Sequence, residues 1–169
     1  MNKKEARRLA LEKRKVFDVD KISKLIEDKI ISSNLLSKYN NIGIYYPLKY
    51  EINLLGLVKY YQEKDFYLPK TKDILEFSKY SLNDTLVDGP FKTKEPISDS
   101  IDINIMDCVI IPCVSITKEK RRIGYGKGYY DKTLASYRGL KIGICYRDFT
   151  DLDVISDEYD LIMDVVISD

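Results

Sequence analysis

The chain of 169 residues contains no histidine, and this absence narrows the chemistry open to it. Ser-His-Asp and Cys-His catalysis both need an imidazole base, and histidine is a common zinc ligand. Any general acid or base must therefore be an aspartate, glutamate, lysine or tyrosine, or must come from substrate or water. A metal ion is expected to be a hard cation held by carboxylates and phosphates, such as magnesium.

Cysteine is also scarce, and its three positions, Cys108, Cys113 and Cys145, form no Cys-x-x-Cys pair. All three lie in apolar, strand-like surroundings, which favours buried reduced thiols over disulfides or metal ligands. Long apolar runs are missing as well, since none approaches the roughly 20 residues needed to span a bilayer. The basic N-terminus is not followed by an apolar signal core, so we expect a cytoplasmic protein.

The chain lacks an excess of either charge: 28 basic residues stand against 27 acidic ones. Such a balance gives no support for a general nucleic-acid or membrane surface. The 44% of hydrophobic residues is typical of an ordinary globular protein.

Periodicity predicts an α/β fold in a single domain, residues 1–169. Helices are expected over residues 3–15, from Asp18 or Asp20 onward, and over 52–63 and 129–137. Strands are expected over residues 42–47, 65–69, 74–80, 108–114, 140–146 and 163–167. This alternation implies a layered, largely parallel sheet flanked by helices, with ligands bound beyond the carboxyl ends of the strands. Pro47, Pro69 and Pro112 would then gather on one edge.

The most informative segment is residues 122–131, Arg-Ile-Gly-Tyr-Gly-Lys-Gly-Tyr-Tyr-Asp. Alternate glycines let a backbone approach a ligand closely, and exposed N–H groups before a helix favour an anion. Arg122 and Lys127 add positive charge, so we interpret the segment as a phosphate cradle. It is neither a Walker A loop, because Gly128 replaces the Ser or Thr, nor a Gly-x-Gly-x-x-Gly motif. A simple glycine-rich turn is the alternative.

Residues 111–131 closely resemble the signature of the 5-formyltetrahydrofolate cyclo-ligase family, with Ile123 in place of leucine. The resemblance extends to a basic first helix with Lys3 and Arg7, to Tyr46, Pro47 and Glu51, to Leu68-Pro69, and to Glu95-Pro96. The C-terminal part departs from the family pattern. Tyr146-Arg-Asp-Phe149 and Glu158-Tyr-Asp160 stand where many members have Phe-x-x-Gln and His-Asp.

The resemblance implies a NagB/RpiA/CoA-transferase-like fold and the ATP- and magnesium-dependent conversion of 5-formyltetrahydrofolate to 5,10-methenyltetrahydrofolate. It implies small-molecule substrates only and a monomer or weak dimer. Arg122 and Lys127 would be catalytic, Asp131 would hold Mg²⁺, and the folate would contact Tyr46, Glu51, Gly126, Lys127, Gly128 and Tyr129. ATP would contact Lys3, Lys4, Arg7, Arg122, Ile123, Gly124, Tyr125, Gly126, Lys127, Gly128, Tyr129 and Tyr130.

Each of these residues also has an ordinary structural explanation. Lys3 and Arg7 could form a solvated helix face, Glu51 could be an acid at a helix N-terminus, and Tyr46 could belong to the core. Asp131 could cap a helix. At the level of function, the alternatives are a sugar-phosphate isomerase or CoA-transferase-like enzyme, and a non-catalytic nucleotide- or folate-binding module.

Overall fold

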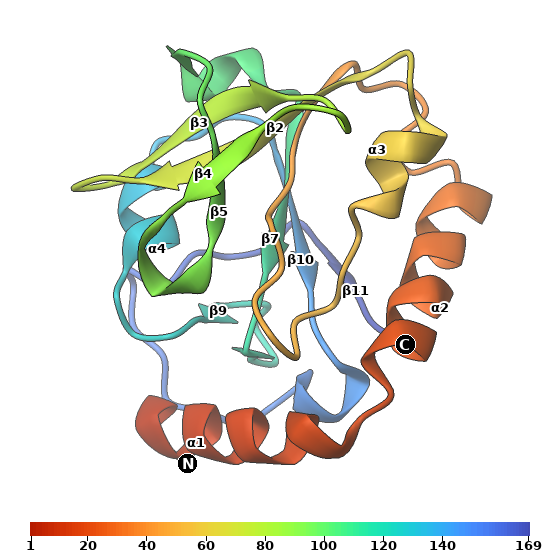
Figure 1. Cartoon of the computed structure of the whole chain (residues 1–169). Coiled ribbons are helices and arrows are strands. Elements are labelled where there is room, and N and C mark those ends of the chain that lie inside the picture. Colours follow the sequence, from red (N-terminus) through yellow and green to blue (C-terminus); the bar gives the residue numbers. More distant parts are fainter.

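The computed structural model describes residues 1–169 and is built on a seven-stranded sheet (Figure 1). Five neighbouring strands, in the order β11-β10-β7-β1-β2, run parallel, and β3 and β6 extend the sheet by antiparallel pairing. The strands span β1 Asn41–Gly43, β2 Asp65–Thr71, β3 Leu75–Tyr80, β6 Ser100–Ile101, β7 Cys108–Pro112, β10 Leu140–Ile144 and β11 Val165–Ile167.

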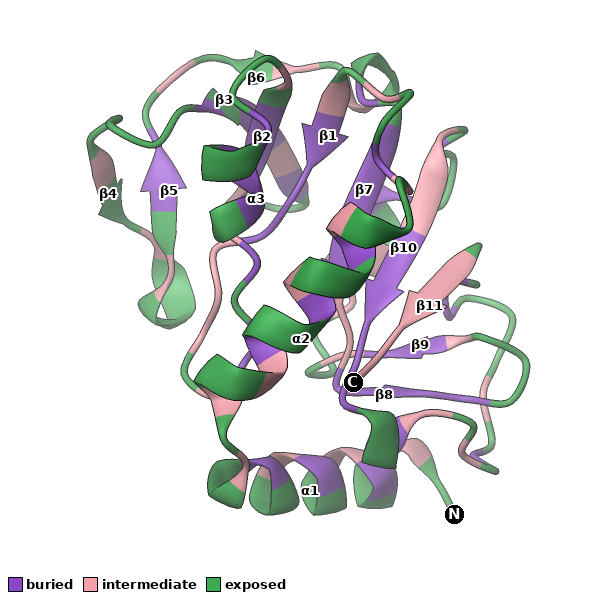
Figure 2. Ribbon diagram, turned by 90° about the vertical axis from the view of Figure 1, so that its right-hand side faces the viewer, coloured by how far each residue is buried: buried purple, intermediate pink, exposed green.

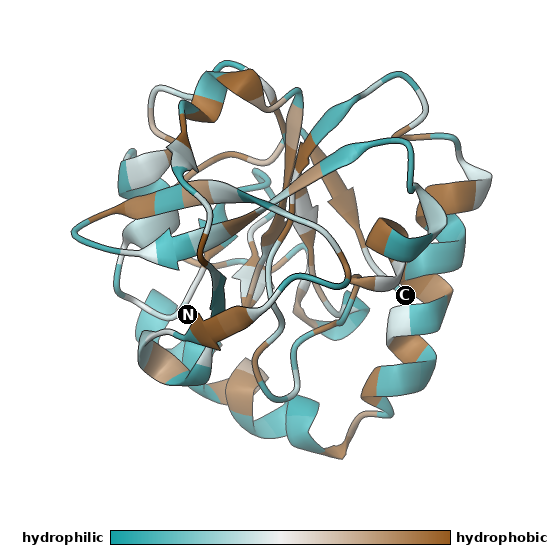
Figure 3. Ribbon diagram, turned by 45° about the horizontal axis from the view of Figure 1, so that its top comes forward, coloured by the Kyte–Doolittle hydropathy of each residue, from teal (hydrophilic) through white to brown (hydrophobic).

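Helices cover both faces of this sheet. Asn2 caps α1 (Lys3–Lys13) and Asp18 caps α2 (Val19–Ser32), which settles the choice between Asp18 and Asp20. The other two helices are short, α3 (Gly56–Tyr60) and α4 (Tyr129–Thr133). In Figure 3, α2 alternates between hydrophobic and hydrophilic stretches as it turns, as expected for a helix with one face on the sheet.

The central strand β7 shows why the sheet needs both layers. Cys108 and Ile110 pack into the larger core cluster together with the buried residues of α2 and α3. Val109 and Ile111 point the other way, into a second cluster with Leu134 just after α4. Because alternate side chains reach opposite faces, the continuous apolar run produces a strand buried on both sides, as Figure 2 shows.

The predicted elements all occur, but several boundaries were wrong. The helix predicted over residues 52–63 covers only Gly56–Tyr60, because the Asn53 side chain accepts the N–H of Leu55 and starts the turn there. The helix after the glycine segment ends at Thr133, and the first strand pairs only as far as Gly43. Strand β2 runs through Pro69 to Thr71. Pro69 is tolerated because β1 has already ended on the side that its missing N–H would face.

Two small hairpins depart from the sheet and carry parts of the site. One pairs β4 (Leu86–Asp88) with β5 (Lys94–Pro96), in a region where the sequence indicated only turns. The other pairs β8 (Ser115–Ile116) with β9 (Arg122–Ile123) and leads into the glycine segment.

The predicted class, an α/β structure with a large, mostly parallel sheet flanked by helices, is confirmed. The finer NagB/RpiA/CoA-transferase-like assignment stays a prediction. None of the helices is both long and apolar enough to cross a bilayer.

Candidate functional site

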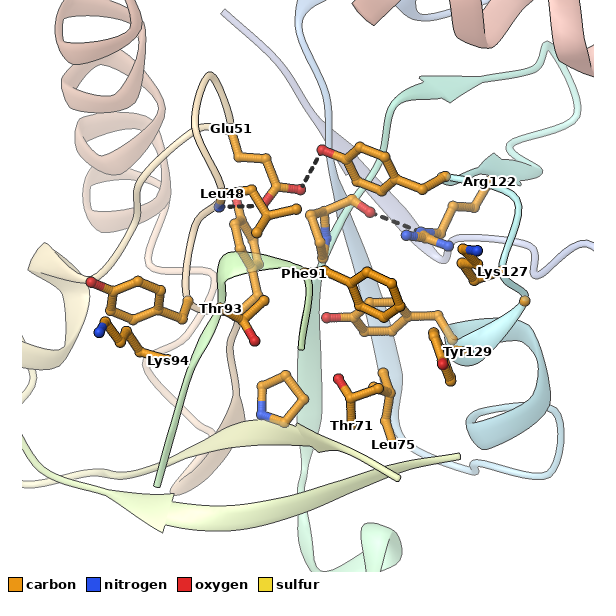
Figure 4. Close-up of a pocket in the computed structure, with 17 residues that line it drawn as sticks. Leu48, Glu51, Thr71, Leu75, Phe91, Thr93, Lys94, Arg122, Lys127 and Tyr129 are labelled. Carbon is orange, nitrogen blue, oxygen red and sulfur yellow. Dashed lines mark hydrogen bonds between the residues drawn. The ribbon is translucent and has the colours of Figure 1, made fainter. Parts of the chain in front are cut away.

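A cavity of about 380 Å³ opens at the carboxyl edge of the sheet. Pro69 of β2 and Pro112 of β7 line it, and so do Tyr46 and Leu48, which flank Pro47 after β1. The predicted gathering of the strand ends is therefore observed. Most of the rest of the wall comes from the glycine segment and the β4–β5 hairpin (Figure 4): Arg122, Tyr125, Lys127, Gly128, Tyr129, Tyr130, Phe91, Thr93 and Lys94. Tyr45, Glu51, Thr71 and Leu75 complete it.

Glu51 is the only acidic side chain lining this cavity, and it is almost completely buried. One carboxylate oxygen accepts the N–H of Leu48 at 2.7 Å, and the other accepts the hydroxyl of Tyr125 at 3.2 Å, as drawn in Figure 4. Burial raises the pKa of Glu51, while the Leu48 N–H, Arg14, Tyr125 and Arg122 act in the opposite direction. A buried carboxylate among aromatic and apolar walls can hold a ligand with N–H donors.

A second, polar cavity of about 160 Å³ adjoins the first, with which it shares Arg122, Tyr125 and Gly128. Cationic groups from distant parts of the chain meet here, because Lys3 and Arg7 of α1 face the glycine segment. The Arg7 Nε donates to the Gly124 carbonyl at 2.7 Å. Two carboxylates, Asp131 and Asp160, line this small polar cavity as well, but the three cations outnumber them, so it suits a phosphate group.

Arg122 lies at the junction of the two cavities and is held rigidly. Its Nε donates to the Pro112 carbonyl at 2.8 Å, and its guanidinium lies over the Tyr130 ring, 4.6 Å from the centroid. The side chain is buried, and its guanidinium fills the space where Gly124 lacks a Cβ. An arginine fixed in this way is preorganised to meet negative charge.

The glycine segment itself adopts the conformation that its composition predicts. Gly126 has φ +96° and Gly128 has φ +73°, values that side-chain-bearing residues rarely adopt. Gly128 immediately precedes α4, so the chain turns from the cavity wall into the helix. Helix α1 packs closely against this segment, since the Arg7 guanidinium lies 3.3 Å from the position of a Cβ at Gly126.

The other residues predicted to contact ATP differ in whether they reach the cavities. Ile123 is buried and lines the second cavity, whereas Lys4 is exposed and lines neither cavity. Lys3 is engaged by the protein, with its ammonium 2.7 Å from Asp157 and 3.0 Å from Asp160. Asp160 belongs to the C-terminal segment that departs from the family pattern, and it lines the second cavity.

Asp131 also opens onto the second cavity, and its Oδ1 accepts the N–H of Leu161 at 3.0 Å. The chain assembles no cluster of three or more acidic, cysteine or histidine side chains around a point that could hold a metal alone. Magnesium needs no such cluster, because it is commonly bound by one or two carboxylates together with substrate phosphates and water. Asp131 beside a phosphate-sized cavity fits that requirement.

Sequence reasoning missed Phe91 and Arg14. Phe91 lies 6.2 Å from the Tyr129 ring, and the Lys127 ammonium lies 5.7 Å from the Phe91 ring. No helical or strand periodicity marks its segment, although Gly89-Pro90 signals the turn that presents it. Arg14 lies seven residues after Arg7, a spacing that places both on one helix face and could have been noticed.

A family model described as the 5-formyltetrahydrofolate cyclo-ligase family matches residues 2–167. Two curated relatives named 5-formyltetrahydrofolate cyclo-ligase are each 30% identical to the chain. The one from Mycoplasma genitalium aligns over 99% of this chain and 98% of its own, and the one from Mycoplasma pneumoniae over 100% and 99%.

Two solved structures are also similar. The 5,10-methenyltetrahydrofolate synthetase of Aquifex aeolicus superposes with a TM-score of 0.88 at 28% identity, covering 99% of this chain and 90% of its own. The 5,10-methenyltetrahydrofolate synthetase of Mycoplasma pneumoniae gives 0.81 at 25% identity, covering 99% and 98%.

Proposed function

The chain belongs to the 5-formyltetrahydrofolate cyclo-ligase family, and from this premise we propose that its two joined cavities hold the folate and the phosphates of ATP side by side. The activity is the ATP-dependent conversion of 5-formyltetrahydrofolate to 5,10-methenyltetrahydrofolate. Neither a sugar-phosphate isomerase nor a CoA-transferase is favoured by these relatives.

The reaction has a chemical difficulty that ATP solves. The N5-formyl group is amide-like, so its carbon is a poor electrophile and its oxygen a poor leaving group. In our proposal the formyl oxygen attacks the γ-phosphorus of ATP, ADP departs, and an N5-iminium phosphate forms. N10 then attacks the formyl carbon and loses its proton, and the carbon–oxygen bond breaks to release phosphate as the ring closes. Both nucleophiles belong to the substrate, so a chain without histidine can perform this chemistry.

The first cavity suits the folate. Its volume of about 380 Å³ lies in the range of small-molecule sites, and its aromatic walls can stack on a pteridine. The buried Glu51 carboxylate would accept the N–H donors of the reduced ring. Tyr46 and Tyr129 line the same cavity and would complete the substrate contacts.

The second cavity suits the phosphates of ATP. Lys3, Arg7 and Arg122 face it, together with Gly124, Tyr125, Gly126 and Gly128. Because positioning and charge neutralisation dominate phosphoryl transfer, these groups supply what the step needs. Ile123 lines this cavity as well, and Tyr130 would support it through its stack on Arg122.

Arg122 and Lys127 would act on the transferring group. Arg122 lines both cavities, and Lys127 lines the folate side next to it (Figure 4). Asp131 would hold Mg²⁺ jointly with the phosphates, and the bound ion would neutralise part of the triphosphate charge. Lys4, exposed on α1, would at most contact the outer part of the nucleotide.

The single observation that supports this proposal best is the shared wall of the two cavities, where a fixed guanidinium separates an acid-bearing aromatic site from a cationic one. The test is direct. Purified protein is mixed with 5-formyltetrahydrofolate, magnesium and ATP, and the absorbance of methenyltetrahydrofolate is followed. Product is expected only when ATP is present, with one ADP per product. Absence of product under all conditions would overturn the function, and product without ATP would overturn the proposed mechanism.

A further inference from the structure

Arg14 is a buried cation that lines neither cavity. It begins the single turn η1 (Arg14–Val16) directly after α1, and only 8% of it is exposed. Its Nη2 donates to the Tyr125 hydroxyl at 2.8 Å and makes a long contact of 3.4 Å with the Lys49 carbonyl. Its Nε is buried without an acceptor in the protein. Burying a guanidinium that is incompletely paired costs free energy, so a buried arginine at this position needs a reason.

The Tyr125 hydroxyl has a second partner in Glu51. It accepts from Arg14 and has one proton to donate, and the Glu51 carboxylate lies 3.2 Å away as the acceptor. The three groups therefore form one directed chain, from guanidinium through phenol to carboxylate. Three different parts of the sequence supply its members: the end of α1, the glycine segment and the loop after β1.

The charges around Glu51 indicate what this chain of hydrogen bonds does. Burial disfavours the ionised form of Glu51, and positive charge favours it. The charged or titratable groups that influence Glu51 or are influenced by it comprise two guanidiniums, four phenols and one thiol: Arg14, Arg122, Tyr45, Tyr125, Tyr130, Tyr146 and Cys113. Of the two positive charges, Arg122 faces the cavity junction and would be engaged by phosphate. Arg14 lies away from the phosphate cavity, so its charge stays available to Glu51.

We propose that Arg14 is a positioning residue for Glu51, which it orients through the Tyr125 hydroxyl. This inference rests on the proposed role of Glu51 in folate binding and extends it to a residue of the N-terminal basic helix. Arg7 and Arg14 lie two helical turns apart on one face of that helix. The same face therefore serves both subsites: Arg7 holds the backbone of the glycine segment, and Arg14 holds a side chain that reaches the folate acid.

The test is a double-mutant cycle on the KM for 5-formyltetrahydrofolate, measured with saturating ATP in the full chain. The variants are Arg14→Met, Glu51→Gln and both together. Arg14→Met is expected to raise this KM about tenfold, the size typical of losing a hydrogen bond to a charged group, while the KM for ATP changes little. In the Glu51→Gln background the same substitution is expected to change it less than about twofold, because Arg14 acts through Glu51.

Two further variants keep the test sharp. Arg8→Met removes an exposed cation from the same helix and is expected to leave both KM values unchanged. Tyr125→Phe removes only the hydroxyl that links Arg14 to Glu51. This variant tests the proposal if Arg14→Met does not fold. It is expected to raise the folate KM and to lose that effect in the Glu51→Gln background.

The outcomes distinguish a failure of the role proposed for Arg14 from a failure of the role proposed for Glu51. If Glu51→Gln raises the folate KM but Arg14→Met and Tyr125→Phe do not, the positioning role of Arg14 is overturned and the proposed function stands. A full Arg14→Met effect that persists in the Glu51→Gln background also overturns it. If Glu51→Gln leaves the folate KM unchanged, the folate-binding role of Glu51 fails, and this inference fails with it.

Discussion

Gly124→Ala adds a single methyl group, and the structure indicates that this should disable the site without unfolding the protein. A Cβ built at Gly124 would lie 2.5 Å from Nη1 and 2.8 Å from Nη2 of Arg122. The backbone at Gly124 is not in the left-handed region, so the substitution brings no backbone strain of its own. The three atoms nearest to the new methyl group all belong to the Arg122 guanidinium, so the effect is expected to act through Arg122.

The guanidinium cannot move away freely. Its Nε is bound to the Pro112 carbonyl at 2.8 Å, and the Tyr130 ring lies against it at 4.6 Å. Restoring an ordinary contact of 3.4 Å needs a displacement of roughly 1 Å, and a misplacement of that size can cost about a hundredfold in rate. Weakening the Pro112 hydrogen bond should cost ~1.5–3 kcal/mol of stability, which lowers the melting temperature by about 3–12 °C.

The assay is turnover of 5-formyltetrahydrofolate with saturating ATP and magnesium, paired with thermal unfolding of each variant. Gly56→Ala is the matched control, because its Cβ would lie 2.7 Å from the tip of another charged side chain, Glu27. Glu27 is only partly buried and makes no hydrogen bond or ion pair, so it can turn aside. A folded Gly124→Ala protein with wild-type turnover would refute the claim that the placement of Arg122 matters.

Other perturbations test the remaining parts of the site. Lys127→Ala should lower turnover about a hundredfold, or ~3 kcal/mol in the transition state. Lys132→Ala, which removes an exposed cation from α4, should not, and equal rates in the two would contradict the role of Lys127. Burial raises the pKa of Glu51, so its carboxylate should be protonated at a higher pH than an exposed glutamate. The folate KM should therefore rise as the pH falls through the pKa of Glu51. A folate KM that does not change with pH in Glu51→Gln would confirm that Glu51 is the titrating group. Chelating divalent cations should abolish activity, and Asp131→Asn should raise the magnesium concentration needed to restore it; an unchanged magnesium titration would exclude Asp131 as a ligand.

The sequence predicts the fold well where the pattern is long and local. The apolar run of β7 and the amphipathic α2 were identified because burial on two faces, or on one, leaves a distinct period in the residues. Short elements were misjudged. In α3 the apolar spacing is correct, yet the Asn53 side chain decides where the helix starts, and no periodicity records such a local hydrogen bond.

The candidate site also has a part that the sequence predicts and a part that it does not. The glycine segment is contiguous, so its close backbone approach and its two cations could be read from the residues alone, but not that Gly126 and Gly128 are left-handed whereas Gly124 is not. Arg14, Tyr125 and Glu51 lie far apart in the chain, and only the packing of α1 against the glycine segment brings them together. Asp157 and Asp160 engage Lys3 through ion pairs that no sequence spacing suggests.

The proposed mechanism is tested most directly by following the formyl oxygen. The purified protein is incubated with ATP, magnesium and 5-formyltetrahydrofolate labelled with ¹⁸O in the formyl group, and the released phosphate is analysed by mass spectrometry. If the formyl oxygen attacks the γ-phosphorus at the junction of the two cavities, each methenyltetrahydrofolate formed is accompanied by one phosphate that carries the label. Formation of the same product with unlabelled phosphate would contradict the account.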